Sequence, residues 1–78
     1  MAESRSSPVI QREEALKIAR EDAEKAYGDL SPYRVLITLE SDGWHVVYEL
    51  RNPHQQGGGP RYVINAATGA VIAKEYSQ

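Results

Sequence analysis

The fold is decided by residues 33–50, which read YRVLITLESDGWHVVYEL. Apolar and polar side chains alternate on both sides of Asp42-Gly43, which is the pattern of two strands that each bury one face. Asp-Gly between two such runs is typical of a two-residue hairpin turn. This turn predicts the buried-face pairs Leu39–Val46, Ile37–Tyr48 and Val35–Leu50, and the opposite-face pairs Glu40–His45, Thr38–Val47 and Leu36–Glu49. A slip of one residue would exchange the faces, so we expect a single register.

A second hairpin is predicted from residues 62–65 and 70–76, which flank a turn. In this turn Asn65 can bond local amides and Gly69 can take a positive φ. A four-residue loop would pair Ile64 with Val71, Tyr62 with Ala73 and Arg61 with Lys74. Residues 52–60 contain two prolines and three consecutive glycines, so they are predicted to form a loop.

One amphipathic helix is predicted before the strands, over residues 10–27. The inward positions at helical spacing are Leu16, Ala19, Ala23 and Ala26, flanked by Ala15, Ile18 and Tyr27. Gln11 stands at the N-cap, a position that Ser, Thr or Asp fills better, and Gly28 supplies the stop. The alanines predict close packing of the helix on a sheet, with Trp44 covering the open end of that sheet against the helix.

The sequence therefore predicts an α+β fold, with one N-terminal helix packed on a four-stranded antiparallel meander sheet. A flexible tail is expected over residues 1–9 and a single domain over residues 10–78. The net charge of −2 gives no reason to expect nucleic acid as a partner, and no run of about 18 apolar residues could span a membrane. There is no cysteine to form a disulfide.

Three stretches resemble the PepSY domain family of bacterial protease propeptides and cell-envelope proteins. They are residues 10–19 on the helix, residues 43–48, and residues 62–72 with their Asn65-Ala-Ala-Thr-Gly69 turn. Gln11 departs from the family's usual Ser or Thr, and Asn65 from its usual Asp. A second resemblance, over residues 57–69, is to the C-terminal part of small bacterial toxin-immunity proteins. Both resemblances imply a non-catalytic module that binds a protein: an inhibitory, envelope-associated module in the first case, and a protein that occludes a cognate toxin in the second.

No catalytic, cofactor or metal site is predicted. The two histidines, His45 and His54, are too few for zinc without cysteine ligands, and no serine stands in a nucleophile context. The three glycines at 57–59 lack the Gly-Lys-Ser/Thr sequence of a phosphate loop. We therefore do not expect an enzyme.

A protein-binding surface is predicted on the face of the sheet opposite the helix. Its proposed residues are Leu36, His45, Val47, Val63 and Ile72, extended by Tyr62, His54, Gln55, Gly57, Gly58 and Gly59. Soluble monomers seldom leave a large contiguous apolar patch exposed, so a partner of unknown identity, a homodimer, the long loop or the tail is expected to cover it.

The first eight residues are too polar to be a signal peptide. Two locations fit them: the cytoplasm, or the periplasm or envelope if a leader has been removed.

Overall fold

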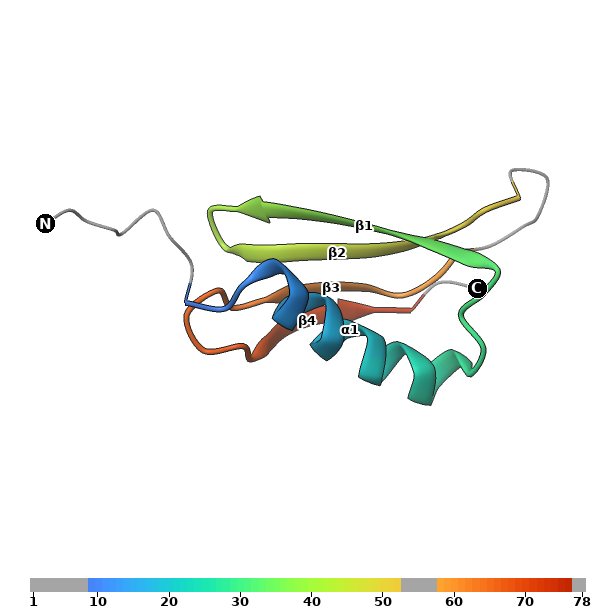
Figure 1. Ribbon diagram of the computed structural model, residues 1–78, viewed down its shortest axis with the longest axis horizontal. Coiled ribbons are helices and arrows are strands. Elements are labelled where there is room, and N and C mark those ends of the chain that lie inside the picture. The colour runs from blue at the N-terminus through green and yellow to red at the C-terminus, as the bar shows by residue number, and fades with distance from the viewer. Residues whose placement is uncertain (1–8, 53–57, 77–78) are drawn as a thin grey trace, which may run out of the picture.

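The computed structural model describes residues 9–52 and 58–76 and confirms the α+β class (Figure 1). Its elements are α1 (Arg12–Tyr27), β1 (Tyr33–Glu40), β2 (Gly43–Leu50), β3 (Arg61–Ile64) and β4 (Val71–Glu75). The strands form one antiparallel sheet in the order β1-β2-β3-β4, as a meander requires. The site residues His54, Gln55 and Gly57, predicted from sequence, lie outside the described residues.

The first hairpin keeps the predicted faces but not the predicted partners. Glu40 pairs with Gly43, so the two-residue loop is Ser41-Asp42 rather than Asp42-Gly43. The buried-face pairs are accordingly Leu39–Trp44, Ile37–Val46 and Val35–Tyr48, and the opposite-face pairs include Thr38–His45, Leu36–Val47 and Arg34–Glu49. Gly43 is needed within β2 itself, because its φ is +134° and any Cβ there would collide with the Ile64 carbonyl oxygen of β3.

The second hairpin contains a bulge that the sequence analysis did not predict. Ile64 pairs with Val71 as expected, but Val63 pairs with Ala73, so Ile72 is an extra residue in β4. The predicted pairs Tyr62–Ala73 and Arg61–Lys74 are therefore wrong. Beyond the bulge the pairs are Tyr62–Lys74 and Arg61–Glu75. The bulge turns Lys74 to the face of the sheet that carries the helix.

The turn of this hairpin forms as predicted. The Asn65 side-chain oxygen accepts hydrogen bonds from the amides of Ala67 and Thr68, at 2.7 and 3.0 Å. Gly69 has a φ of +82°, and its amide donates to the Asn65 carbonyl. A residue with a Cβ would be strained at Gly69.

Helix α1 is fastened at its start by the sheet rather than by a side-chain cap. The side chain of Gln11 makes no capping hydrogen bond. Just before it, the Ile10 amide donates to the Ala66 carbonyl at 2.7 Å, and the Trp44 indole donates to the Ile10 carbonyl at 2.8 Å. Trp44 is buried and thus joins the end of the sheet to the helix, as predicted.

The core is a stripe of helix alanines packed on two strands, β2 and β3. Its fully buried helix residues are Ala15, Ala19 and Ala23, and its sheet residues are Trp44, Val46, Tyr48, Tyr62 and Ile64. Ala26, predicted to point inward, is exposed. Figure 1 shows α1 along the side of the sheet that includes β3 and β4, with β1 at the edge away from it. Val35 and Leu39 of β1 consequently stay 40% and 45% exposed, although both were predicted to be buried.

Candidate functional site

The face of the sheet opposite α1 carries two cross-strand rows of side chains. One row runs Thr38, His45, Val63, Ala73, and the next runs Leu36, Val47, Arg61, Glu75. We call this surface the outer face. A shallow groove of about 400 Å³ lies on it over β2, β3 and β4. The groove has an apolar floor with charged and polar groups at its margin.

Ion pairs border the apolar part of the outer face. The Arg34 guanidinium donates two hydrogen bonds to the same oxygen of Glu49, at 3.2 and 3.0 Å. Arg61 lies 3.7 Å from Glu75 across β3 and β4. These side chains are largely exposed, so each pair contributes little to stability and serves mainly to fix where charge is displayed.

His45 is held by the turn beside it. Its Nε2 lies 2.7 Å from an oxygen of Asp42, and this hydrogen bond lowers the pKa of the Asp42 carboxyl. The contact keeps the imidazole at the margin of the groove, next to Val63 of β3. His45 therefore offers a polar, hydrogen-bonding group beside an apolar floor.

The structure brings together part of the site predicted from sequence. His45, Val47 and Val63 line the groove, and Leu36 continues the Val47 row to β1. Ile72, at the bulge, is 54% exposed but is not among the residues of the groove.

Two of the predicted site residues do not present an exposed side chain on the outer face. Tyr62 contributes to the lining of the groove, but its side chain is only 2% exposed and its hydroxyl bonds to Asp22 of the helix. Gly59 is buried: its amide donates to the Tyr48 carbonyl at 3.1 Å, and a Cβ there would approach Tyr48 Cβ to 2.7 Å. The Tyr48 amide in turn donates to the Pro60 carbonyl. Residues 59 and 60, predicted to be loop, therefore extend the β2–β3 pairing, and Gly58 is half-buried beside them.

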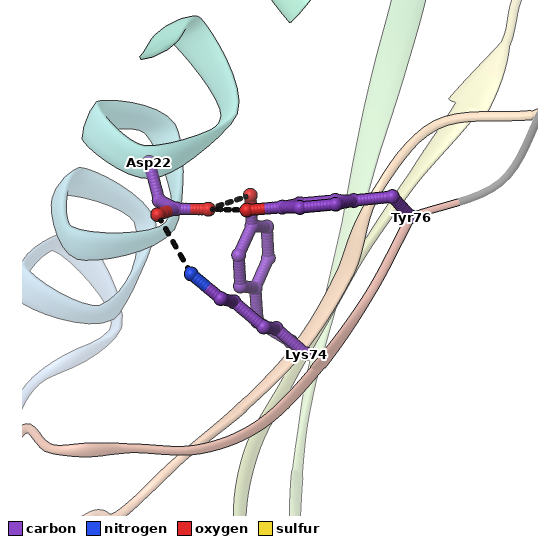
Figure 2. Close-up of polar contacts among 4 residues, drawn as sticks. Asp22, Lys74 and Tyr76 are labelled. Atoms are coloured by element: carbon purple, nitrogen blue, oxygen red, sulfur yellow. Dashed lines mark hydrogen bonds and ion pairs between the residues drawn. The ribbon is translucent and has the colours of Figure 1, made fainter. Parts of the chain in front are cut away.

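A second polar cluster ties the helix to the sheet on the other face, and we call it the Asp22 cluster. One oxygen of Asp22 accepts hydrogen bonds from Tyr62 and Tyr76, at 2.9 and 2.6 Å. The other oxygen accepts from the Lys74 ammonium at 3.2 Å. Figure 2 shows Lys74 and Tyr76 reaching Asp22 from the strand side. The Lys74 ammonium also lies 5.6 Å from the centre of the Tyr76 ring, in the range of a cation–π contact.

The contacts of the Asp22 cluster favour an ionised Asp22, a protonated Tyr62 and a protonated Lys74. Tyr76 above all, together with Tyr62 and Lys74, holds the pKa of Asp22 below its ordinary value, although partial burial opposes the shift. Burial, and then Asp22, raises the pKa of Tyr62. Tyr76 and Asp22 raise the pKa of Lys74. Each of these shifts moves a group's pKa away from neutrality, whereas a general acid or base needs a pKa near the working pH. The contacts therefore fit a structural tether.

Sequence reasoning missed Asp22, Arg61 and Glu75, and each left a signal. Asp22 follows Ile18 by four residues and Ala19 by three, which puts a carboxylate on the apolar side of the helix. The predicted register set Arg61 against Lys74, and like charges directly opposite each other are unfavourable. A register that sets Arg61 against Glu75 removes that conflict, and it is the one observed.

Residues 9–52 and 58–76 contain no group of three or more His, Asp or Glu side chains arranged to hold a metal ion. Within the same ranges, no helix has the length and hydrophobicity that a membrane span requires. Comparisons of the chain with models of protein families, with curated proteins and with solved structures found no match.

Proposed function

We propose that the chain is a non-catalytic module that binds another protein through the outer face. The observation that carries this proposal is the pair of neighbouring rows on that face, in which Leu36, Val47 and Val63 lie among separated charges. Protein interfaces obtain most of their affinity from a few apolar anchors within a polar rim, and this surface has that composition.

The resemblance to PepSY domains supports an inhibitory role within this general function, in the bacterial envelope. The resemblance of residues 57–69 to toxin-immunity proteins supports a second role, the occlusion of a cognate toxin. The groove favours neither role over the other, because both need an exposed binding face. The identity of the captured partner distinguishes them: a peptidase or envelope protein would favour the first role, and a toxin the second.

The test places one charge in the centre of the outer face. Val47 lies between Leu36 and Arg61 in its row, so Val47→Glu puts a carboxylate on the floor of the groove. Immobilised wild-type chain should retain a partner that the Val47→Glu chain does not retain. Circular dichroism and thermal unfolding establish that the variant is folded.

A matched control adds the same charge on the helix. Ala26→Glu changes an exposed residue of α1, far from the outer face, and should retain the partner as the wild type does. If folded Val47→Glu captures the same proteins as Ala26→Glu, binding does not use the outer face and the proposal is wrong.

A further inference from the structure

Among the described residues, strand β1 is an unpaired edge of the sheet, and apart from the charges of Arg34 and Glu40 it lacks the features that usually protect one. It is eight residues long, regular, and free of proline, glycine and bulges. Its side chains Val35, Leu36 and Leu39 are 40–45% exposed. The other edge, β4, is only five residues long and is interrupted by the bulge. Exposed, long, apolar edge strands are templates for pairing with a further strand.

The backbone groups of β1 that are available to pair with another strand can be deduced from the hydrogen bonds between β2 and the residues just before β3. Both the amide and the carbonyl of Tyr48 bond across to residues 59 and 60, so they point away from β1. Val35, the partner of Tyr48 on β1, therefore turns its own amide and carbonyl away from β2. By alternation Ile37 and Leu39 do the same, and no segment of the described chain pairs with this side of β1.

We propose that two copies of the chain associate through their β1 edges, antiparallel and about a two-fold axis at Ile37. This arrangement goes beyond the proposed binding function, since it uses the edge of the sheet and not its outer face. Its cross-strand pairs are Ile37 with Ile37, Val35 with Leu39, Leu36 with Thr38, and Arg34 with Glu40. Each pair other than Ile37 with Ile37 therefore occurs twice, once with each copy supplying the first residue, as a two-fold interface requires.

Charge selects this register from its neighbours. β1 has one basic and one acidic residue, Arg34 and Glu40, and they lie at equal distances from Ile37. Centring the axis on Ile37 places each Arg34 opposite a Glu40, twice per dimer. An axis at Leu36 would set Arg34 opposite Thr38. An axis at Thr38 would leave Arg34 without a partner residue in β1 of the other copy. Opposite charges directly across a strand pair favour a register, and like charges disfavour it.

The dimer also covers apolar surface on the helix side of the sheet. A groove of about 260 Å³ lies between α1 and the first two strands, lined by Leu16, Val35 and Tyr48 and by charged helix residues. The helix leaves Val35 and Leu39 of β1 partly exposed, because its core contacts are with β2 and β3. Pairing about Ile37 sets Val35 of each copy beside Leu39 of the other. The apolar strip left uncovered by one helix thereby becomes the centre of the interface.

The experiment exchanges the two charges and measures association by sedimentation velocity at low ionic strength. Arg34→Glu makes both β1 charges acidic, and Glu40→Arg makes both basic. Each variant alone should dimerise about tenfold more weakly than the wild type, because two attractive contacts per dimer become repulsive. An equimolar mixture of the two variants should recover association, since every Glu then faces an Arg. This recovery depends on the register centred on Ile37.

Arg61→Glu provides a matched control. It sets two carboxylates opposite each other on β3 and β4, just as Arg34→Glu does with Glu49 on the first two strands. It should leave self-association unchanged. The proposal is wrong if the wild-type chain stays monomeric at millimolar concentration. It is also wrong if the mixed variants associate no better than each variant alone.

Discussion

The Tyr62 hydroxyl donates a hydrogen bond of 2.9 Å to the Asp22 carboxylate, joining the buried centre of β3 to the middle of α1. Tyr62 is 2% exposed, so water has little access to its hydroxyl. Hydrogen bonds to a charged partner in such a setting contribute roughly 1.5–3 kcal/mol. With the Trp44–Ile10 bond at the other end of the helix, this contact fixes α1 on the side of the sheet away from the outer face.

Two tyrosine variants should separate buried from exposed contacts with Asp22. Tyr62→Phe is expected to lower the free energy of unfolding by roughly 1.5–3 kcal/mol. Tyr76→Phe should cost less than about 1 kcal/mol, because Tyr76 is 48% exposed and water can replace its hydroxyl. Urea denaturation of the two variants measures the difference. Equal losses would mean that the Asp22 cluster is solvated throughout.

Asp22 should make the stability of the protein depend on pH in the acid range. Its pKa is lowered in the folded state, so the stabilisation is present above the unfolded-state pKa near 3.9 and is lost as pH falls through the folded-state value. Asp22→Asn should therefore be less stable than the wild type at neutral pH, and the gap should shrink as the pH falls below about 4. Asp29 and Asp42 also have lowered pKa values, but they are present in both proteins. The difference in unfolding free energy between the wild type and Asp22→Asn therefore reports on Asp22. A gap that stays constant with pH would contradict the role assigned to the carboxylate.

Two isoleucines offer a matched test of the core. Ile64 is fully buried under the helix and Ile72 is 54% exposed at the bulge. Ile64→Ala should cost about 2–5 kcal/mol, the range for large-to-small changes in a core. Ile72→Ala should cost under about 1 kcal/mol. Comparable losses in thermal unfolding would show that β4 has been placed with the wrong faces.

Trp44 should report on the attachment of the helix. It is the single tryptophan of the chain, so its emission reflects this site alone. Trp44→Phe removes the bond to the Ile10 carbonyl and part of the ring, and should cost about 1–3 kcal/mol. In the wild type, folded emission should be blue-shifted relative to unfolded emission, since the ring is 8% exposed. Emission that is unchanged on unfolding would contradict its burial.

The faces of the strands could be predicted from sequence, whereas their partners could not. Alternation along residues 33–50 fixes which side chains share a face, and a shift of two residues preserves that assignment. In the observed register Gly43 lies against the carbonyl of Ile64, a contact from a distant part of the chain that the alternation does not reveal. The bulge at Ile72 likewise concerns the pairing of β4 with β3, which alternation along β4 alone does not determine.

The position of the helix over the sheet could not be predicted from the hydrophobic pattern of the sequence either. The spacing of Ala15, Ala19 and Ala23 predicts a close-packed helix, but not which strands it covers. Because α1 lies away from β1, residues predicted to be core became exposed edge residues. Only part of the predicted binding surface, chiefly His45, Val47 and Val63, comes together in one groove, because Gly59 is buried in the extended β2–β3 pairing and Ile72 lies at the bulge.

The most direct test of the central claim, that function resides on the outer face, is an NMR titration. Amide chemical shifts of labelled chain are followed as the partner captured by the wild type is added. The largest changes should fall on Leu36, Val47, Val63 and Ala73, with helix amides from Arg12 to Tyr27 little affected. Changes concentrated on the helix, with the outer face unmoved, would contradict the proposed function.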